Sequence, residues 1–65
     1  MGYIRSSAIW AAKHDPISLR LTLWFKDGGH PYDYFGVPRR VYQGLLTASS
    51  AGSYFNAYIR DQYSA

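Results

Sequence analysis

The stretch Leu19-Arg20-Leu21-Thr22-Leu23-Trp24-Phe25-Lys26, followed directly by Asp27-Gly28-Gly29, decides the fold of this chain. Its residues alternate with a period of two, which is typical of a strand with one buried face. Glycine accepts positive φ angles without steric cost, so Asp-Gly-Gly indicates a hairpin turn. The sequence therefore predicts a strand that leads into a hairpin. The buried face is expected to carry Leu19, Leu21, Leu23 and Phe25, and the opposite face Arg20, Thr22 and Trp24.

Two further strands are expected on either side of this one. The first runs from Ala8 or Ile9 to His14 and ends at an Asp15-Pro16 turn, because proline fixes φ at the corner and aspartate bonds the backbone ahead of it. The third strand, over 32–35, places Tyr32 and Tyr34 on one face and Asp33 on the other.

Two short helices follow. Pro38 opens the first, where its missing N–H is no loss, and Val41, Tyr42 and Leu45 form an amphipathic stripe. A second helix is expected over 53–62, with Ser50 or Ser53 as its N-cap. The predicted fold is α+β: a three-stranded antiparallel β-meander followed by two short helices packed on one sheet face. Residues 1–7 are expected to form an N-terminal arm, and residues 8–63 a single domain.

The amino-acid composition excludes several classes of protein. The chain has 65 residues, of which 48% are hydrophobic and 18% aromatic, so it is too apolar for a disordered protein. It has no cysteine, which excludes disulfides and thiolate zinc sites and fits a reducing compartment. We therefore expect a cytoplasmic protein, without a signal peptide or a membrane span. The net charge of +3 permits a polyanionic partner.

Catalytic chemistry is not indicated. The carboxylates belong to four aspartates, each with a local structural explanation in a turn, on a strand or near a helix end. His14 and His30 lack the spacing of a metal pair. We predict a non-enzymatic protein that uses no metal and no cofactor.

Aromatic and basic residues are the stronger candidates for a binding site. Tyr32 and Tyr34 either enter the core together or form a platform on which unpaired bases stack. Trp24 is expected on the open face of the sheet, and Trp10 joins it if the first strand pairs in regular register. The candidate nucleic-acid-binding residues are Arg20, Trp24, Tyr32, Tyr34, Arg39, Arg40 and Arg60. The candidate protein-interface residues are Trp10 and Trp24.

The chain also resembles a known family. Its motifs include Val37-Pro38 leading to Val41-Tyr42, and Tyr54-Phe55-Asn56 leading to Ile59-Arg60. This set resembles the KTSC domain, which stands at the C-terminus of some lysyl-tRNA synthetases and also occurs as small free-standing bacterial and phage proteins. The resemblance covers about Ser6 to Tyr63, and it implies the predicted fold and a role in RNA binding. One departure is Lys13-His14, where the family usually has Gly-Tyr.

Two functions remain open from the sequence. The first is a nucleic-acid-binding module, with RNA as the expected partner. The second is a protein-interaction module, either a homodimer through the open sheet face or an accessory factor of a phage or its host. Binding that weakens steeply with salt favours the first, because phosphate neutralisation releases counterions. A strong effect of replacing Trp24 with little salt dependence favours the second.

Overall fold

The central hairpin forms where the alternating pattern places it. In the computed structural model, which describes residues 2–4 and 8–63, strand β3 (Leu21–Phe25) pairs antiparallel with β4 (Tyr32–Tyr34). Leu21 faces Tyr34 and Leu23 faces Tyr32 across the ladder. Gly28 and Gly29 adopt φ angles of 87° and 84°, so this turn requires the backbone freedom that glycine provides.

The other side of β3 pairs with β2 (Ile9–His14), also antiparallel. The three predicted strands are therefore confirmed. A further short strand, β1 (Gly2–Tyr3), pairs with β2 and falls within the expected N-terminal arm. It completes a four-stranded sheet in the order β1-β2-β3-β4. The prediction of an arm at residues 5–7 lies outside the described residues.

The expected start of the central strand is wrong by two residues. Leu19 belongs to the preceding turn, because its φ of 59° is incompatible with an extended strand. Its N–H donates to the Asp15 carbonyl at 2.8 Å, and its carbonyl accepts the Val37 N–H at 2.9 Å. The side chain is 36% exposed and does not join the buried face. Phe25 lies at the margin of the core, partly buried and packed against it.

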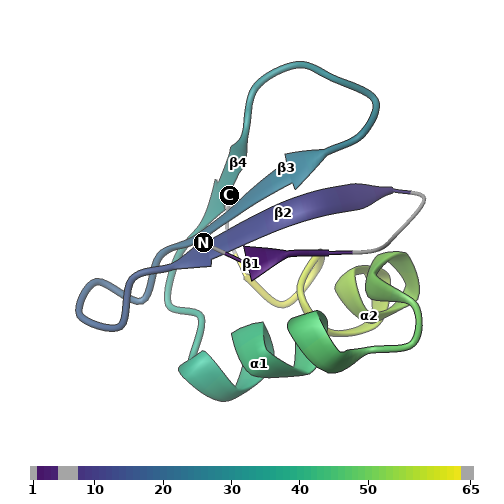
Figure 1. The fold of residues 1–65 in the computed structure, drawn as a ribbon. Coiled ribbons are helices and arrows are strands. Elements are labelled where there is room, and N and C mark those ends of the chain that lie inside the picture. Colours follow the sequence, from purple (N-terminus) through teal and green to yellow (C-terminus); the bar gives the residue numbers. More distant parts are fainter. Residues whose placement is uncertain (1, 5–7, 64–65) are drawn as a thin grey trace.

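Two helices cover one face of the sheet, as predicted (Figure 1). Helix α1 (Arg39–Thr47) begins directly after Pro38. Helix α2 (Ala51–Tyr58) begins earlier than expected because Ser50 is its N-cap and accepts the Ser53 N–H at 3.3 Å. After α2 the chain turns through backbone bonds such as that from the Arg60 N–H to the Phe55 carbonyl, 2.9 Å long.

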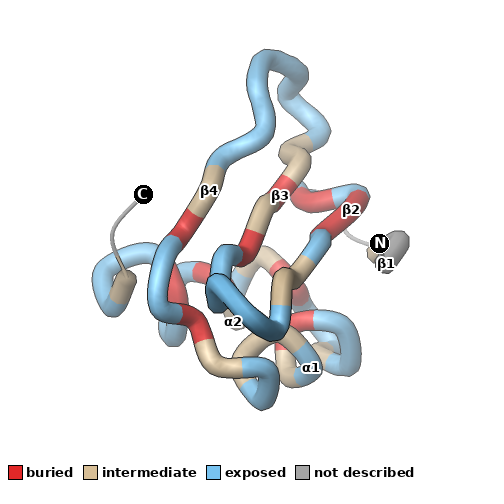
Figure 2. The backbone as a smooth tube through the Cα atoms, turned by 90° about the vertical axis from the view of Figure 1, so that its left-hand side faces the viewer, coloured by how far each residue is buried: buried red, intermediate tan, exposed pale blue. Residues whose placement is uncertain are grey.

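The core lies between the sheet and the helices. Figure 2 shows buried positions along the strands and helices, whereas the long loop between β3 and β4 is exposed. The cluster of buried side chains comprises Ile9, Ala12, Leu21, Leu23, Tyr34, Val37, Leu45, Ala51, Phe55 and Ile59. The opposite face of the sheet has no helix over it (Figure 1). Within the described part of the chain, neither helix has the length and apolar character needed to cross a bilayer.

Candidate functional site

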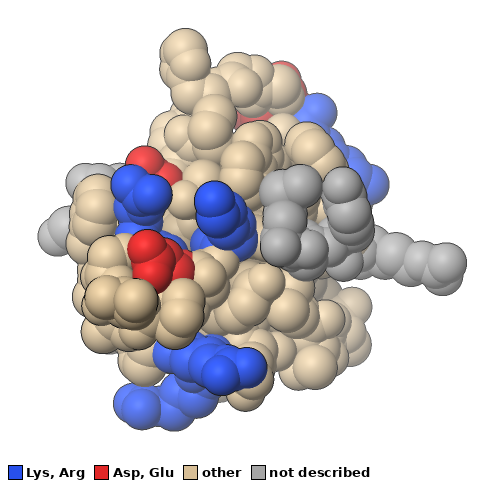
Figure 3. Space-filling view, turned by 60° about the vertical axis from the view of Figure 1, so that its left-hand side comes forward, with Lys and Arg blue, Asp and Glu red and all other residues tan. Residues whose placement is uncertain are grey.

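The basic side chains lie in several separate places. Lys13 is on β2 and Arg20 directly precedes β3, whereas Arg39 and Arg40 occupy the first turn of α1. Arg60 lies beyond the end of α2. Figure 3 shows that the Lys and Arg side chains on the visible face form groups separated by uncharged surface. The predicted arginines therefore do not form one stripe.

The uncovered sheet face brings two of these cations together with polar residues. Leu21 and Leu23 point into the core, so Thr22 between them faces away from the helices. Lys13 is the cross-strand partner of Thr22, and Asp33 is its partner on the other side. The Thr22 hydroxyl donates to Asp33 Oδ1 at 2.6 Å. Lys13, Thr22 and Asp33 therefore form a row of polar side chains across one half of the open face.

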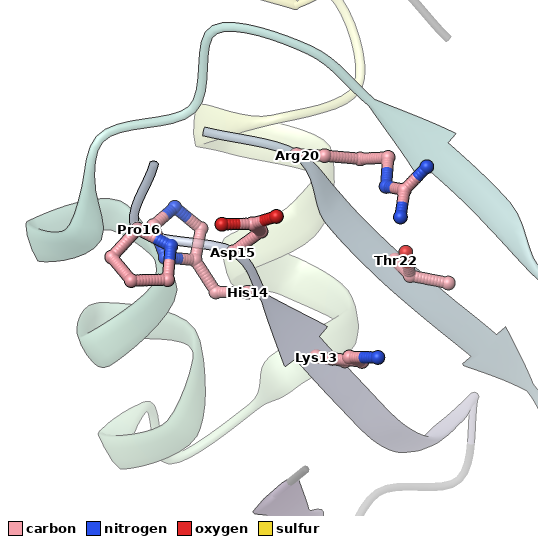
Figure 4. Close-up of a pocket in the computed structure, with 6 residues that line it drawn as sticks. All are labelled: Lys13, His14, Asp15, Pro16, Arg20 and Thr22. Carbon is pink, nitrogen blue, oxygen red and sulfur yellow. The ribbon is translucent and has the colours of Figure 1, made fainter. Parts of the chain in front are cut away.

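A cavity of about 220 Å³ lies at this end of the sheet. Figure 4 shows Lys13 extending from β2, with Arg20 and Thr22 on the neighbouring chain segment. Asp15 also lines the cavity, and its carboxylate accepts the backbone N–H groups of Ile17 at 2.9 Å and Ser18 at 3.3 Å. The Ile17 bond is the main reason that the pKa of Asp15 lies below its ordinary value, followed by the bonds to Ser18. Asp15 thus shapes the turn, while Lys13 and Arg20 are exposed cations.

Two tryptophans occupy the other half of the open face. Ile9 pairs with Phe25 and Ala11 with Trp24, so Trp10 is an additional residue at a β-bulge. The ring centroids of Trp10 and Trp24 are 6.3 Å apart, and the ring planes are inclined by 48°. Trp10 is 39% exposed and Trp24 is partly buried. The sequence predicts this contact only for a regular register; the two rings meet although the β-bulge makes the register irregular. We call Trp10, Lys13, Arg20, Thr22 and Trp24 the open-face site.

The predicted tyrosine pair is divided between two environments. Tyr34 is 8% exposed and belongs to the core, whereas Tyr32 is 50% exposed. The alternatives of a shared core position and a shared platform are therefore both wrong: Tyr34 lies beneath Phe55, and Tyr32 is nearer the end of the sheet. Burial raises the pKa of Tyr34, with a smaller raising effect from Tyr32 and an opposing one from Arg60.

Both tyrosines line a second cavity on the helix side of the sheet, with a volume of about 390 Å³. Arg60 reaches it from beyond α2, so the fold brings this predicted residue to the tyrosines. The residues around it are Phe25, Asp27, Tyr32, Tyr34, Phe55 and Arg60. Arg39 and Arg40 line neither this cavity nor the one beside Lys13. We call this second cavity the aromatic cavity.

The His14 side chain makes two defined contacts. His14 is partly buried, its Nε2 lies 2.7 Å from the Val37 carbonyl oxygen, and its ring stacks on Tyr42 with centroids 5.3 Å apart. These contacts join β2 to α1, so His14 has a structural role in the packing of the helix on the sheet. Among the described residues, no group of three or more histidine, cysteine or acidic side chains is placed to hold a metal ion.

Sequence reasoning missed Lys13 and Asp27. In the sequence, Lys13 stands out only as a departure from a family motif. The β-bulge at Trp10 and the pairing of Lys13 with Thr22 place it on the same sheet face as the tryptophans. Asp27 was assigned to a turn, which it does occupy, and it also reaches the aromatic cavity. A bulge and a cavity depend on the assembled sheet, so no local sequence signal identifies them.

Comparison with known proteins identifies the relatives of this chain. The family model described as the KTSC domain matches residues 5–63. A protein of Tsukamurella paurometabola is 40% identical over 62 residues, which cover 95% of this chain and 91% of that protein. The crystal structure of a KTSC domain protein from Yersinia pestis superimposes with a TM-score of 0.90 at 32% identity, covering 97% of this chain and 87% of that one.

A third relative is a much longer protein. A lysine–tRNA ligase of a Nostoc species is 42% identical over 57 residues. The match covers 88% of this chain but 10% of the ligase. The similarity therefore concerns one small segment of that enzyme.

Proposed function

Because this chain belongs to the KTSC domain family, we propose that this small module binds single-stranded RNA through its open-face site and has no catalytic activity. The observation that carries the proposal is the placement of two tryptophans, 6.3 Å apart, on the same sheet face as Lys13 and Arg20, opposite the helices. That face combines flat apolar rings with cations, the two kinds of group that single strands require.

The two halves of the site have different tasks. Bases of a single strand stack on Trp10 and Trp24, and each such base contributes about 1–3 kcal/mol. Lys13 and Arg20 neutralise phosphates of the same strand, which supplies a salt-dependent part of the affinity. Thr22 and Asp33 hold the strand pairing between them through their 2.6 Å hydrogen bond. Stacking of this kind tolerates many sequences, because every base has a π-face.

The relatives support RNA as the partner. One homologous segment belongs to a protein named lysine–tRNA ligase, whose name states that it acts on tRNA. A binding module for RNA is useful to such an enzyme because it increases the local concentration of the substrate. We extend this reasoning to the present chain, where the same fold carries the open-face site.

Tryptophan fluorescence tests the proposal directly, because Trp10 and Trp24 are the two tryptophans of the chain. Titration with unstructured single-stranded RNA at about 50 mM salt is expected to quench the emission as bases stack. The same titration at about 200 mM salt is expected to give weaker binding. Absence of quenching and of binding at the lower salt concentration would refute RNA recognition by this face.

A matched pair of double variants locates the site. Lys13→Gln/Arg20→Gln removes the two open-face cations, and Arg39→Gln/Arg40→Gln removes two cations from α1. The first is expected to lower the slope of log K against log salt by about 1.4, because each phosphate contact on a single strand contributes about 0.7. The second is expected to change that slope little. Equal losses in both variants would show that only net charge matters.

The protein-interaction hypothesis is tested by measuring self-association of the chain. Sedimentation over a range of protein concentrations measures self-association without RNA. A dimer that dissociates on Trp24→Ala substitution, together with no RNA-dependent quenching, would assign the open face to a second copy of the chain and overturn the RNA proposal.

A further inference from the structure

The aromatic cavity is separate from the open-face site. Its walls come from the helix-facing side of β3 and β4, from α2 and from the segment after α2. Trp24 points to the opposite face of the sheet from its neighbour Phe25. A ligand in the aromatic cavity therefore has no direct contact with the two tryptophans.

The cavity is built mainly of aromatic rings. Phe25 contacts Tyr32 at a centroid distance of 5.4 Å and an angle of 77°, and it contacts Phe55 at 5.4 Å and 75°. Tyr34 meets Phe55 at 5.6 Å and 72°. All three contacts are edge-to-face, which is one of the two preferred geometries for packed rings. Phe55 and Tyr34 are almost fully buried and form the inner wall, whereas Tyr32 keeps half of its surface exposed.

The volume of about 390 Å³ falls in the range of about 300–1,000 Å³ that is usual for small-molecule sites. Two charged residues of opposite sign complete the lining, Arg60 and Asp27, and both are exposed. A guanidinium is suited to bidentate binding of phosphate. A carboxylate accepts hydrogen bonds from paired N–H donors.

A ligand that satisfies all three features needs a flat aromatic ring, an anionic group and an edge with N–H donors. A phosphorylated sugar lacks the ring, and an apolar ligand makes no polar contact with either charged residue. A nucleotide has the ring and the phosphate. Among the common bases, guanine presents two adjacent N–H donors, from N1 and N2, to a single carboxylate.

We propose that the aromatic cavity binds one guanine nucleotide, with the base against Tyr32, its N–H edge toward Asp27 and its phosphate on Arg60. The nucleotide is either free or part of an RNA strand, and the recognition chemistry is the same in both cases. This site goes beyond the open-face proposal, because a mononucleotide binds here without contact with the tryptophans.

The test uses two-dimensional ¹H–¹⁵N NMR of the labelled chain during titration with guanosine 5′-monophosphate. Saturable shifts are expected for backbone amides of Asp27, Tyr32, Phe55 and Arg60. The two indole N–H signals report separately on the open face and are expected to stay in place. Ribose 5-phosphate is expected to bind at least about tenfold more weakly, because it makes no stacking contact. Uridine 5′-monophosphate is also expected to bind more weakly, since it presents one N–H donor where guanine presents two.

Three variants separate the contributions of the lining residues. Tyr32→Ala is expected to weaken the nucleotide by about tenfold through loss of stacking. Arg60→Gln is expected to weaken the nucleotide by about tenfold and to leave unphosphorylated guanosine unchanged. Asp27→Asn is expected to reduce the preference for guanosine over uridine monophosphate. Each variant is first checked for an intact amide spectrum, and Arg40→Gln is the matched control for charge.

Several results would overturn the proposal. One is equal binding of ribose 5-phosphate and the nucleotide, which would identify a simple anion site. Another is movement of the indole signals alone, which would place the nucleotide on the open face. The open-face proposal is tested by tryptophan quenching with RNA, so either proposal can fail while the other stands.

A guanine-containing oligonucleotide that binds more tightly than the mononucleotide, with both sets of signals shifting, would assign the nucleotide to RNA. Equal affinity for the oligonucleotide and the mononucleotide would identify the free nucleotide as the ligand.

Discussion

Leu19 holds a backbone conformation that ordinary residues avoid. Its φ of 59° lies in the left-handed region, where a Cβ atom costs about 1–2 kcal/mol. We expect Leu19→Gly to unfold at a higher urea concentration than Leu19→Ala, with a difference of about 1 kcal/mol. Both variants lose the same partly exposed leucine side chain, so the comparison isolates the backbone. In a helix or strand the order is reversed, and an alanine variant as stable as the glycine variant would show that position 19 is unstrained.

Asp15, in the same turn, makes the stability of the protein depend on pH in the acidic range. The N–H groups of Ile17 and Ser18 hold its pKa below the value of 3.8 that an unperturbed aspartate has. A group whose pKa is lower in the folded state stabilises the protein above its unfolded pKa, and this contribution disappears as the pH falls through the folded pKa. We expect Asp15→Asn to flatten the fall in stability between about pH 5 and pH 2.

Urea denaturation at a series of pH values measures this effect. Asparagine keeps a side-chain oxygen that can accept the same N–H groups but has no titrating charge. The Asp15→Asn curve is therefore expected to approach the wild-type curve as the pH decreases. Two parallel curves over the whole range would contradict the assigned role of this carboxylate.

The packing of α1 on α2 depends on the absence of a side chain at Gly44. A Cβ atom there would lie 2.7 Å from Cζ and 3.0 Å from Cε2 of Tyr54, too close without movement of the tyrosine. Alanine gains about 1 kcal/mol in helix propensity over glycine, whereas overpacking costs about 1–3 kcal/mol. We expect Gly44→Ala to destabilise the protein in urea titrations, because Tyr54 also packs on Tyr58 with ring centroids 4.7 Å apart.

The Tyr54→Ala background tests this explanation. Without the ring, Gly44→Ala is expected to stabilise the protein by about 1 kcal/mol, so the effect changes sign. The coupling between the two positions measures the steric contact. If Gly44→Ala has the same effect in both backgrounds, Tyr54 is not the cause.

At the level of elements, local patterns predicted much of this fold. Alternation identified β3, turn chemistry identified its hairpin, and Pro38 marked the start of α1. For α2 the sequence left both Ser50 and Ser53 open as the N-cap, and the structure selects Ser50. The sequence alone could not separate Tyr32 from Tyr34, which share a face but differ in burial because α2 covers one of them. Nor could it identify β1, whose two residues are too short for any periodicity. These features depend on tertiary packing rather than on local sequence.

The two proposed sites lie on opposite sides of one thin sheet. The molecule measures 28 × 24 × 22 Å, and β4 is an edge strand of three residues. On both proposals, a single RNA strand that passes around this edge is expected to reach both sites. Binding at one site then raises the effective concentration of the strand at the other, so the combined affinity exceeds that of either site alone.

This geometry predicts a dependence on RNA length that rests on both proposals. A guanine-ended oligonucleotide of about 12 nucleotides is expected to bind more tightly than one of about 4, because only the longer strand engages both sites. Arg60→Gln is expected to remove this advantage and to preserve tryptophan quenching by either oligonucleotide. Fluorescence titration of both lengths against both proteins measures the effect. If Arg60→Gln weakens both lengths equally, no strand bridges the two sites, and each site binds its own ligand.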